Sequence, residues 1–289
     1  MTVLGILHPG SMGAAVAAQA KRSGAEVLWC PTGRSLASRE RAQRYGLRPV
    51  SDLGEMAQEA DIILSICPPS HAAEVAAAVA AQGFSGLYID GNAVSPATMT
   101  SVSATLRRSG ATVIDGSVIG SPPSDSKDTR LYLAGPSQGL AQVAAVFADS
   151  TVRVHPLPGD IGQASALKLS YSSYQKASRA LAAVAHAFAV DHGVEGELLD
   201  IAQGRTTSYL AETAYFSKVA ARAWRWAPEM REVAHALDEV GLPSDLATAS
   251  AAVMERWNDL RDTTVEIEQA LAALHRRADS KDAELTGES

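Results

Sequence analysis

A run of polar side chains at helical spacing lies in the middle of the chain. At about 100° per residue, Lys168, Ser172 and Gln175 fall within roughly 60° of one another on a single helix face. A lysine in a cleft can act as a general acid or base where burial or a neighbouring cation shifts its pKa toward neutrality. The serine and the glutamine could hold a substrate by hydrogen bonds. On the residues alone, a lysine on a helix is more often a solvated surface charge.

The turn after the first strand-like run is a second candidate for chemistry. In a turn that binds a dinucleotide, glycines allow a tight bend and let the backbone approach the pyrophosphate, which rests on the next helix N-terminus. Gly10 and Gly13 occupy the second and third glycine positions of the pattern G-x-G-x-x-G, and His8 stands at the first. The alternative is an ordinary strand–helix turn. The predicted cofactor-binding residues here are His8, Pro9, Gly10, Ser11, Met12 and Gly13.

The segment after the second strand-like run indicates which dinucleotide would bind. An acidic residue there would hydrogen-bond a ribose 2′-hydroxyl and repel a 2′-phosphate, but no carboxylate occurs until Glu40. Arg34 offers a planar, permanently charged fork to a 2′-phosphate. The sequence therefore favours NADP(H) over NAD, and the alternative is an arginine that only caps a solvated loop. The predicted contacts are Thr32, Gly33, Arg34 and Ser35.

Two later strand ends complete the predicted cofactor site. Cys67, Pro68 and Pro69 end the third strand-like run and are expected to lie along the cofactor mainly through their backbone. Asn92 follows the fourth run and is a further predicted cofactor-binding residue, whereas His71 is expected at the surface. Cys30 and Cys67 are the only cysteines, too few for a disulfide framework and without metal-ligand spacing, so we expect buried reduced thiols and no metal site.

Short apolar runs alternate with Ala-rich helical stretches in the first half, which is typical of an α/β fold with a doubly wound, mostly parallel sheet. The predicted strands are Val3–Leu7, Ala25–Cys30, Asp61–Ile66, Leu87–Asp90, Ala111–Asp115, Leu131–Ala134 and Thr151–His155. The helices between the early strands are Met12–Ser23, Leu36–Tyr45, His71–Gln82 and Pro96–Ser109.

The second half contains only helical patterns. Its predicted helices are Gln163–His192, Gly196–Gln203, Thr206–Trp226, Met230–Val240, Asp245–Leu260 and Val265–Arg277. We therefore expect a cofactor-binding domain over residues 1–160, an all-helical domain over residues 161–280, and a polar, frayed tail over residues 281–289.

Trp224 and Trp226 mark the helical half. Because they are two positions apart, they cannot both face one side of a helix. One is expected to pack in the core and the other to line a cleft or a subunit contact. Aromatic and other side chains that could form a substrate pocket there are Tyr209, Tyr215, Phe216, Met230 and His235.

Four segments in order resemble the β-hydroxyacid dehydrogenase superfamily, which includes 3-hydroxyisobutyrate dehydrogenase and 6-phosphogluconate dehydrogenase. They are Met12-Gly13, Cys67-Pro68-Pro69, the run from Asp90 to Pro96, and Gly162 to Lys168; the resemblance covers residues 2–185. It implies a Rossmann domain followed by a helical domain, a long helix joining them, and a homodimer whose active site borrows residues from the partner. The family signature G-x-G-x-x-x-K-x-x-x-N maps onto Gly162, Ala164, Lys168 and Ser172, which implies that Lys168 is catalytic.

The chain departs from this family at several positions. Ser172 replaces the asparagine and His8 replaces the first glycine. The substrate loop D-x-P-V-S-G-G reads Asp115 to Ser121 here, with Ile119 in place of the serine that would grip a substrate carboxylate. This run is similar to the loop of imine reductases, which commonly carry Asp or Tyr where this chain keeps Lys168. The predicted substrate-binding residues are Ser117, Ile119, Gly120, Ser121, Ser172 and Gln175.

The sequence thus predicts an NADP(H)-dependent dehydrogenase or reductase that acts on a hydroxy acid or related carbonyl compound, with Lys168 as general acid/base. An imine reductase on the same scaffold and a catalytically idle NADP-binding protein are the alternatives. The net charge of −7 argues against non-specific binding to nucleic acid or to an anionic membrane. The chain has no signal-peptide pattern and no apolar run of about 20 residues, so we expect a cytoplasmic protein.

Overall fold

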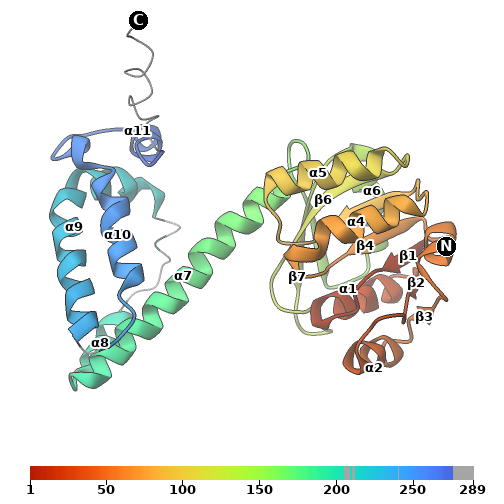
Figure 1. The fold of residues 1–289 in the computed structure, drawn as a ribbon, viewed down its shortest axis with the longest axis horizontal. Helices are drawn as coiled ribbons and strands as arrows, with labels where there is room; N and C mark the ends of the chain where they lie inside the picture. The colour runs from red at the N-terminus through yellow and green to blue at the C-terminus, as the bar shows by residue number, and fades with distance from the viewer. Residues whose placement is uncertain (205–208, 210–211, 240, 276–289) are drawn as a thin grey trace, which may run out of the picture. The chain divides into compact units, whose positions relative to one another are not determined.

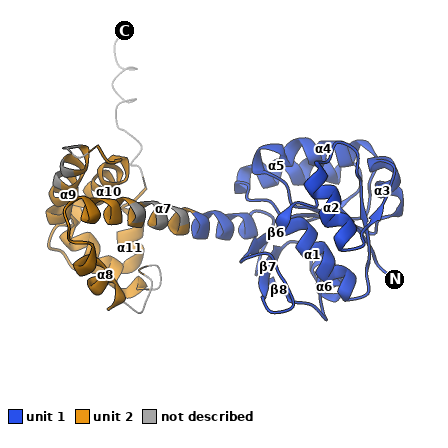
Figure 2. Ribbon diagram, turned by 90° about the horizontal axis from the view of Figure 1, so that it is seen from below, with its two compact units in different colours: residues 1–172 blue, residues 173–289 orange. Residues whose placement is uncertain are grey.

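The computed structural model describes residues 1–204, 209, 212–239 and 241–275. It divides the chain into two compact units, Met1–Ser172 and Ser173–Ser289 (Figure 2). The units meet inside one helix, α7 (Gln163–Asp191), whereas the sequence had placed the domain boundary before it. The predicted tail, residues 281–289, lies outside the described residues.

The first unit contains a doubly wound sheet in the order β3-β2-β1-β4-β5-β6-β7-β8. All neighbouring strands are parallel except β6 and β7, which the loop after Ile119 joins without a helix. The predicted α/β class and its mostly parallel sheet are confirmed. The strands are β1 Val3–Ile6, β2 Glu26–Trp29, β3 Arg48–Pro49, β4 Ile62–Ser65, β5 Leu87–Asp90, β6 Thr112–Ile119, β7 Thr129–Ala134 and β8 Val152–Pro156.

Helices cover both faces of this sheet (Figure 1). Residues of α1, α2 and α6 belong to one buried core, and residues of α3, α4 and α5 belong to the other. The helices are α1 Ser11–Arg22, α2 Leu36–Arg44, α3 Leu53–Glu59, α4 Ala72–Ala81, α5 Pro96–Arg107 and α6 Ser137–Val146. The sequence did not predict β3, α3 or α6. The first two are too short for a clear periodicity, and Gly139 weakens the helical pattern of the third.

The strand order reverses between β1 and β4. Crossover helices then leave the carboxyl ends of these two strands on opposite sides, which opens a crevice at their ends. His8 follows β1 and Cys67 follows β4, so both lie at this edge of the sheet. The fold therefore places the predicted cofactor-binding turns at the topological switch point.

Helices joined by turns make up the second unit, and residues 173–204, 209, 212–239 and 241–275 contain no strand. Its small core packs Ala220 and Ala223 against Trp257, whose indole N–H donates to Ala270 O at 2.7 Å. Besides α7, the helices are α8 Glu195–Gln203, α9 Phe216–Glu239, α10 Asp245–Glu255 and α11 Ile267–Ala272, with short 3₁₀ turns at Thr213–Tyr215 and Asn258–Leu260.

The sequence was wrong to divide α9. It predicted separate helices Thr206–Trp226 and Met230–Val240, but one helix runs from Phe216 through Pro228 to Glu239. A proline inside a helix removes one hydrogen bond and costs about 3 kcal/mol. Buried alanines and leucine continue on both sides of Pro228, at Ala223, Ala227 and Leu237, and their packing offsets this cost. Residues 206–208, 210–211, 240 and 276–277 of these predictions lie outside the described residues.

The tryptophan pair also differs from expectation, because neither side chain is fully buried. The ring of Trp224 stacks against the guanidinium of Arg261, 3.7 Å from its carbon to the ring centroid, and its N–H donates to Asp262 at 3.2 Å. Asp262 has a φ of +53°, and its own N–H donates to Ala221 O. Trp224 therefore fastens the segment after α10 onto α9 through polar and cation–π contacts.

Candidate functional site

The turn between β1 and α1 has one crowded side and one open side. A Cβ on Gly13 would lie 2.2 Å from the carbonyl oxygen of His8, so only glycine fits there. A Cβ on Gly10 would meet no atom within 4 Å. Gly10 is the N-cap of α1, no side chain caps this end, and the first turn carries no acid. The first backbone N–H groups of α1 are therefore open to an anion.

Two nitrogen-bearing side chains beside this open turn, His8 and Arg34, each have a buried atom without a partner in the described part of the chain. The Nδ1 atom of His8 and the Nε atom of Arg34 are buried and have no hydrogen-bond partner among the described residues. Burial, then the charges of Arg34 and His71, lower the pKa of His8 to about 4. These three side chains thus come together from the ends of β1, β2 and β4. An unpartnered arginine Nε–H beside a helix N-terminus fits a phosphate-bearing cofactor, and the His8 Nδ1 can join it in the tautomer that protonates this atom.

The other predicted residues of the Arg34 loop, Thr32, Gly33 and Ser35, stabilise the conformation of the loop and the start of α2. The hydroxyl of Thr32 donates to Ser51 O at 3.3 Å. Ser35 is the N-cap of α2, and its hydroxyl accepts from Ser38 N at 3.3 Å. Gly33 takes a φ of +71°, which favours glycine. Of the predicted residues in this loop, Arg34 is therefore the one whose side chain has a nitrogen, Nε, without a partner among the described residues. This atom can bind a ligand.

Asn92 ties the end of β4 to the end of β5. Its Oδ1 accepts from Cys67 N at 2.6 Å, and its Nδ2 donates to the hydroxyl of Ser65 at 3.1 Å. The side chain is buried and holds the backbone that faces the crevice, with Pro68 and Pro69 exposed beside it. Both cysteines are free but only half-buried, not buried as predicted, and burial raises the pKa of the Cys67 thiol.

Asp90, at the carboxyl end of β5, is a buried carboxylate that the sequence did not single out. Its Oδ1 accepts from Asn92 N at 3.0 Å, whereas its Oδ2 has no partner among the described residues. Burial, with a smaller contribution from the charge of Asp115, raises its pKa to about 6. Asp115 lies opposite it in the sheet register. The signal was available in the sequence, because each of two successive predicted strands, Leu87–Asp90 and Ala111–Asp115, ends in an aspartate.

The Asp90→Asn variant should gain stability relative to the wild type as the pH rises. In the wild type, burial disfavours the ionised form of Asp90, which raises its pKa in the folded protein to about 6 from the ordinary 3.8. Ionisation therefore destabilises the folded wild type, with no effect below about pH 4 and the full effect above about pH 7. The difference in unfolding free energy should change by about 2–4 kcal/mol across this range. Urea denaturation of both proteins at several pH values measures it. A pH-independent difference would contradict the buried charge.

The first turn of α7 is fixed to β6 by Asp115. The Asp115 carboxylate accepts from the N–H groups of Gly162 at 2.8 Å and Ser165 at 3.1 Å, and from the Ser165 hydroxyl at 2.7 Å. These are the unpaired N–H groups of a helix N-terminus, which a carboxylate stabilises. Burial nevertheless raises the pKa of Asp115 above its ordinary value.

Two further hydrogen bonds set the position of Lys168. The hydroxyl of Ser117 donates to Ala164 O at 2.7 Å, so this buried side chain, predicted to bind substrate, instead joins β6 to α7. One turn later, the amine of Lys168 donates to Val118 O at 2.5 Å. Lys168 is half-buried at the carboxyl end of β6 and does not extend freely into solvent.

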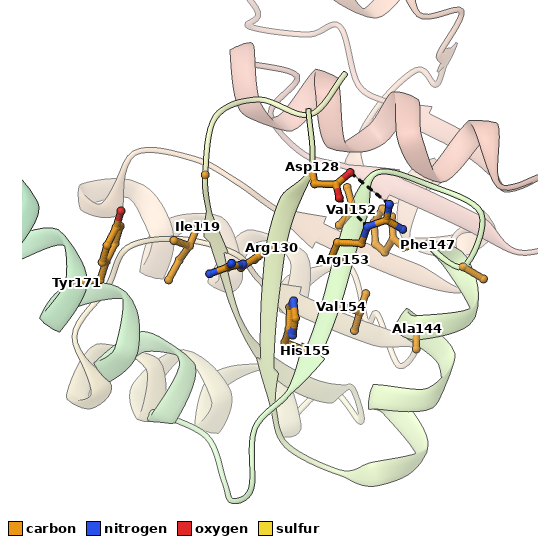
Figure 3. A pocket seen from close by; sticks show the side chains of 12 residues that line it. Ile119, Asp128, Arg130, Ala144, Phe147, Val152, Arg153, Val154, His155 and Tyr171 are labelled. Atoms are coloured by element: carbon orange, nitrogen blue, oxygen red, sulfur yellow. Dashed lines mark hydrogen bonds and ion pairs between the residues drawn. The ribbon is translucent and has the colours of Figure 1, made fainter. Parts of the chain in front are cut away.

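The structure brings some predicted substrate residues together and separates others. Ile119 and Gly120 line a cavity of about 840 Å³ together with Tyr171 of α7 (Figure 3). Ser121 is exposed in the loop after β6. Ser172 and Gln175 both lie on α7, on either side of the boundary between the two units. In the second unit, Tyr209, Tyr215 and Phe216 line one apolar pocket, whereas Met230 packs in a separate cluster and His235 is exposed.

Comparison with known proteins supports this architecture. The NAD binding domain of 6-phosphogluconate dehydrogenase matches residues 3–157, and a domain of unknown function (DUF1932) matches residues 189–257. An uncharacterised 28.5 kDa protein of Methanothermus fervidus is 26% identical over 176 residues, which span 61% of this chain and 66% of that protein. No helix of the described residues is long and apolar enough to cross a membrane.

Solved structures share the fold over nearly the whole chain. A reductive aminase from Aspergillus terreus in complex with NADPH has a TM-score of 0.70 at 18% identity, covering 95% of this chain and 100% of that chain. The 3-hydroxyisobutyrate dehydrogenase of Mycobacterium tuberculosis has a TM-score of 0.61 at 17% identity, covering 96% and 100%. With the domain match over more than half of its residues, this chain belongs to the family that carries the NAD binding domain of 6-phosphogluconate dehydrogenase.

Proposed function

We propose that this protein is an NADP(H)-dependent oxidoreductase that transfers a hydride between nicotinamide and a hydroxy acid or a related carbonyl compound. The observation that carries the proposal is the position of Lys168, whose amine is held 2.5 Å from Val118 O at the carboxyl end of β6. Ligands bind at this edge in open α/β sheets. Membership of a family with an NAD-binding domain supports a nicotinamide cofactor.

The residues of the β1–α1 turn would hold the cofactor. The open side at Gly10 and the first N–H groups of α1 suit its pyrophosphate. Arg34 suits the 2′-phosphate, because its buried Nε has no partner in the part of the chain that the structure describes, and the Nδ1 of His8 suits a phosphate oxygen. When bound, NADP(H) would supply the hydride acceptor or donor.

In this proposal, Lys168 moves the proton. During oxidation its amine takes the proton of the substrate hydroxyl, and during reduction its ammonium returns a proton to the carbonyl oxygen. Asp115 and Ser117 act as positioning residues, because their hydrogen bonds to the first turns of α7 fix the helix that carries the lysine. Such alignment preserves the geometry that proton transfer requires.

Calorimetric titration with NADPH and NADH tests the cofactor assignment. We expect the wild type to prefer NADPH and the Arg34→Ala variant to lose roughly 10- to 100-fold in NADPH affinity, because a charged hydrogen bond to the 2′-phosphate is removed. The Arg44→Ala variant is the matched control, since Arg44 is exposed at the C-terminal end of α2, the helix that follows the Arg34 loop. Equal binding of both cofactors would contradict the NADP preference. Binding of neither would overturn the oxidoreductase proposal.

An imine reductase is the second candidate. The TM-score of 0.70 with the reductive aminase exceeds that of 0.61 with the dehydrogenase, which favours this candidate at the level of fold. The presence of Lys168 favours alcohol or carbonyl chemistry. Incubation with NADPH and either a cyclic imine or a keto acid would separate the two, because one yields an amine and the other an alcohol.

The homodimer that the family resemblance implies stays a prediction for this chain. Several large apolar side chains of the second unit are exposed, including Ile201 at 74% and Val190 at 50%. Pairing of two copies through such surfaces would remove apolar area from water. We expect light scattering to give twice the mass of the chain.

A further inference from the structure

His8 is a titratable side chain in the β1–α1 turn, at a position where the family pattern has glycine. Its role is therefore particular to this chain. The Nδ1 atom is buried and has no hydrogen-bond partner among the described residues. Unpaired buried polar atoms are rare in native proteins and cost free energy. This atom therefore calls for a partner from outside the chain, either solvent or a ligand.

The strand order brings Arg34 to the same place. β1 lies between β2 and β4, and Ile6 pairs with Trp29 in the β1–β2 register. His8 and Pro31 each follow this pair by two positions. The chain then turns, because Arg34 N donates to Pro31 O at 3.2 Å, which returns Arg34 to the end of β2. Adjacent strands are about 4.8 Å apart, so His8 and Arg34 extend from neighbouring points of one sheet edge.

The groups around His8 oppose its protonation in the free protein. Burial is the largest cause and the charges of Arg34 and His71 add to it, so the pKa of His8 falls to about 4 from the ordinary 6.5. His71 stands on the β4 side, with its Nδ1 atom 3.4 Å from the carboxylate of Glu74. The first turn of α1 carries no acid, and burial raises the pKa of the Cys67 thiol, which stays uncharged at neutral pH. His8 is accordingly neutral near pH 7.

We propose that His8 takes up a proton from solvent when it binds the 2′-phosphate of NADP(H) together with Arg34, so that cofactor binding is linked to pH. The inference rests on the proposed function and describes the regulation of the same cofactor site. Arg34 follows β2, where dinucleotide-binding folds place the ribose 2′ position. A phosphate monoester carries close to two negative charges at neutral pH, so it outweighs the guanidinium charge and favours an imidazolium. Because the complex then holds more protons than the free protein, affinity falls as the pH rises.

Calorimetric titration with NADP⁺ and NAD⁺ at pH 6, in buffers that differ in ionisation enthalpy, counts the protons taken up on binding. The oxidised cofactors are the probes because they are stable in acid, and NAD⁺ lacks only the 2′-phosphate. With NADP⁺, the wild type should take up at least about half a proton more than the His8→Asn variant, whose amide can donate a hydrogen bond but does not titrate. With NAD⁺, the two proteins should take up the same number. From pH 5 to pH 7, the affinity of the wild type for NADP⁺ should fall roughly tenfold or more relative to that of the variant.

The comparison with the variant also removes the titration of the phosphate itself, which is common to both proteins. His155→Asn is the matched control, because it removes an exposed histidine of the same unit on the edge strand β8, away from β1. Its proton uptake should equal that of the wild type. His8→Gly restores the glycine of the family pattern and should behave as His8→Asn does, which keeps the test valid if the amide disturbs folding.

Equal proton uptake by the wild type and both His8 variants would show that the neutral imidazole binds the phosphate, and it would overturn the inference. The same excess with NAD⁺ would overturn it as well, because the 2′-phosphate would not be the cause. In both cases NADP⁺ still binds, so the proposed function survives. Absence of binding by either cofactor overturns the proposed function together with this inference.

Discussion

The Lys168→Met variant is expected to lose roughly 10²- to 10⁴-fold in kcat while binding NADPH as tightly as the wild type. This range is what a positioned general acid or base contributes. Methionine keeps an unbranched stem of similar length, so packing beside β6 should persist, but it can neither accept nor donate a proton. Steady-state kinetics with a hydroxy acid that the wild type oxidises, together with NADPH titration of the same variant, measures both expectations.

A Lys168→Arg variant separates proton transfer from charge. An arginine keeps the positive charge but is not deprotonated in proteins, so it should be nearly as inactive as the methionine variant. Retention of most activity by the arginine variant would show that position 168 needs only a cation. Unchanged kcat in both variants would remove Lys168 from the mechanism and favour the idle NADP-binding alternative if NADPH still binds.

Gly13→Ala should lower the unfolding free energy by about 1–3 kcal/mol, the range found for an overpacked site. Helix propensity alone predicts the opposite, because alanine is about 1 kcal/mol better than glycine inside a helix. We expect a loss of stability instead, because the new Cβ would lie 2.2 Å from the backbone oxygen of His8 and neither atom can move alone. NADPH affinity should fall at least tenfold as the turn opens, on the order of 1.4 kcal/mol.

Gly10→Ala is the matched control on the open side of the same turn. No atom lies within 4 Å of its Cβ position, and the backbone, at φ −68° and ψ −172°, suits alanine. We expect its unfolding free energy to stay within about 0.5 kcal/mol of the wild type. Its NADPH affinity should still fall roughly tenfold, because the Cβ occupies the side from which a pyrophosphate approaches. Chemical denaturation and NADPH titration of both variants test the pair, and identical behaviour would contradict the assignment of the two sides.

Local sequence patterns were enough to predict much of the fold. The alternation of apolar strands and Ala-rich helices was enough to predict the sheet of the first unit, because these periodicities reflect which side of each element is buried. The turn from His8 to Gly13 could be located because its glycine spacing is a local requirement of backbone geometry. The position of Lys168 near the start of a long helix followed from the same kind of pattern, whereas its catalytic role was implied by the resemblance and stays a proposal.

Only the tertiary structure decided what several of these side chains contact. Ser117 was expected to face a substrate, but it donates to Ala164 O, 47 positions away.

The sequence by itself thus determined the α/β class, the position of the glycine-containing turn after β1, and the helix that carries Lys168. The tertiary structure decided which side chains pair within the protein: among the described residues the Nε of Arg34 has no partner, whereas Asn92 and Ser117 hydrogen-bond to the backbone of neighbouring segments. The physical reason is that periodicity and turn chemistry act between near neighbours in the chain. Hydrogen-bond partners and burial depend instead on segments that are distant in sequence, so they are settled only when those segments pack.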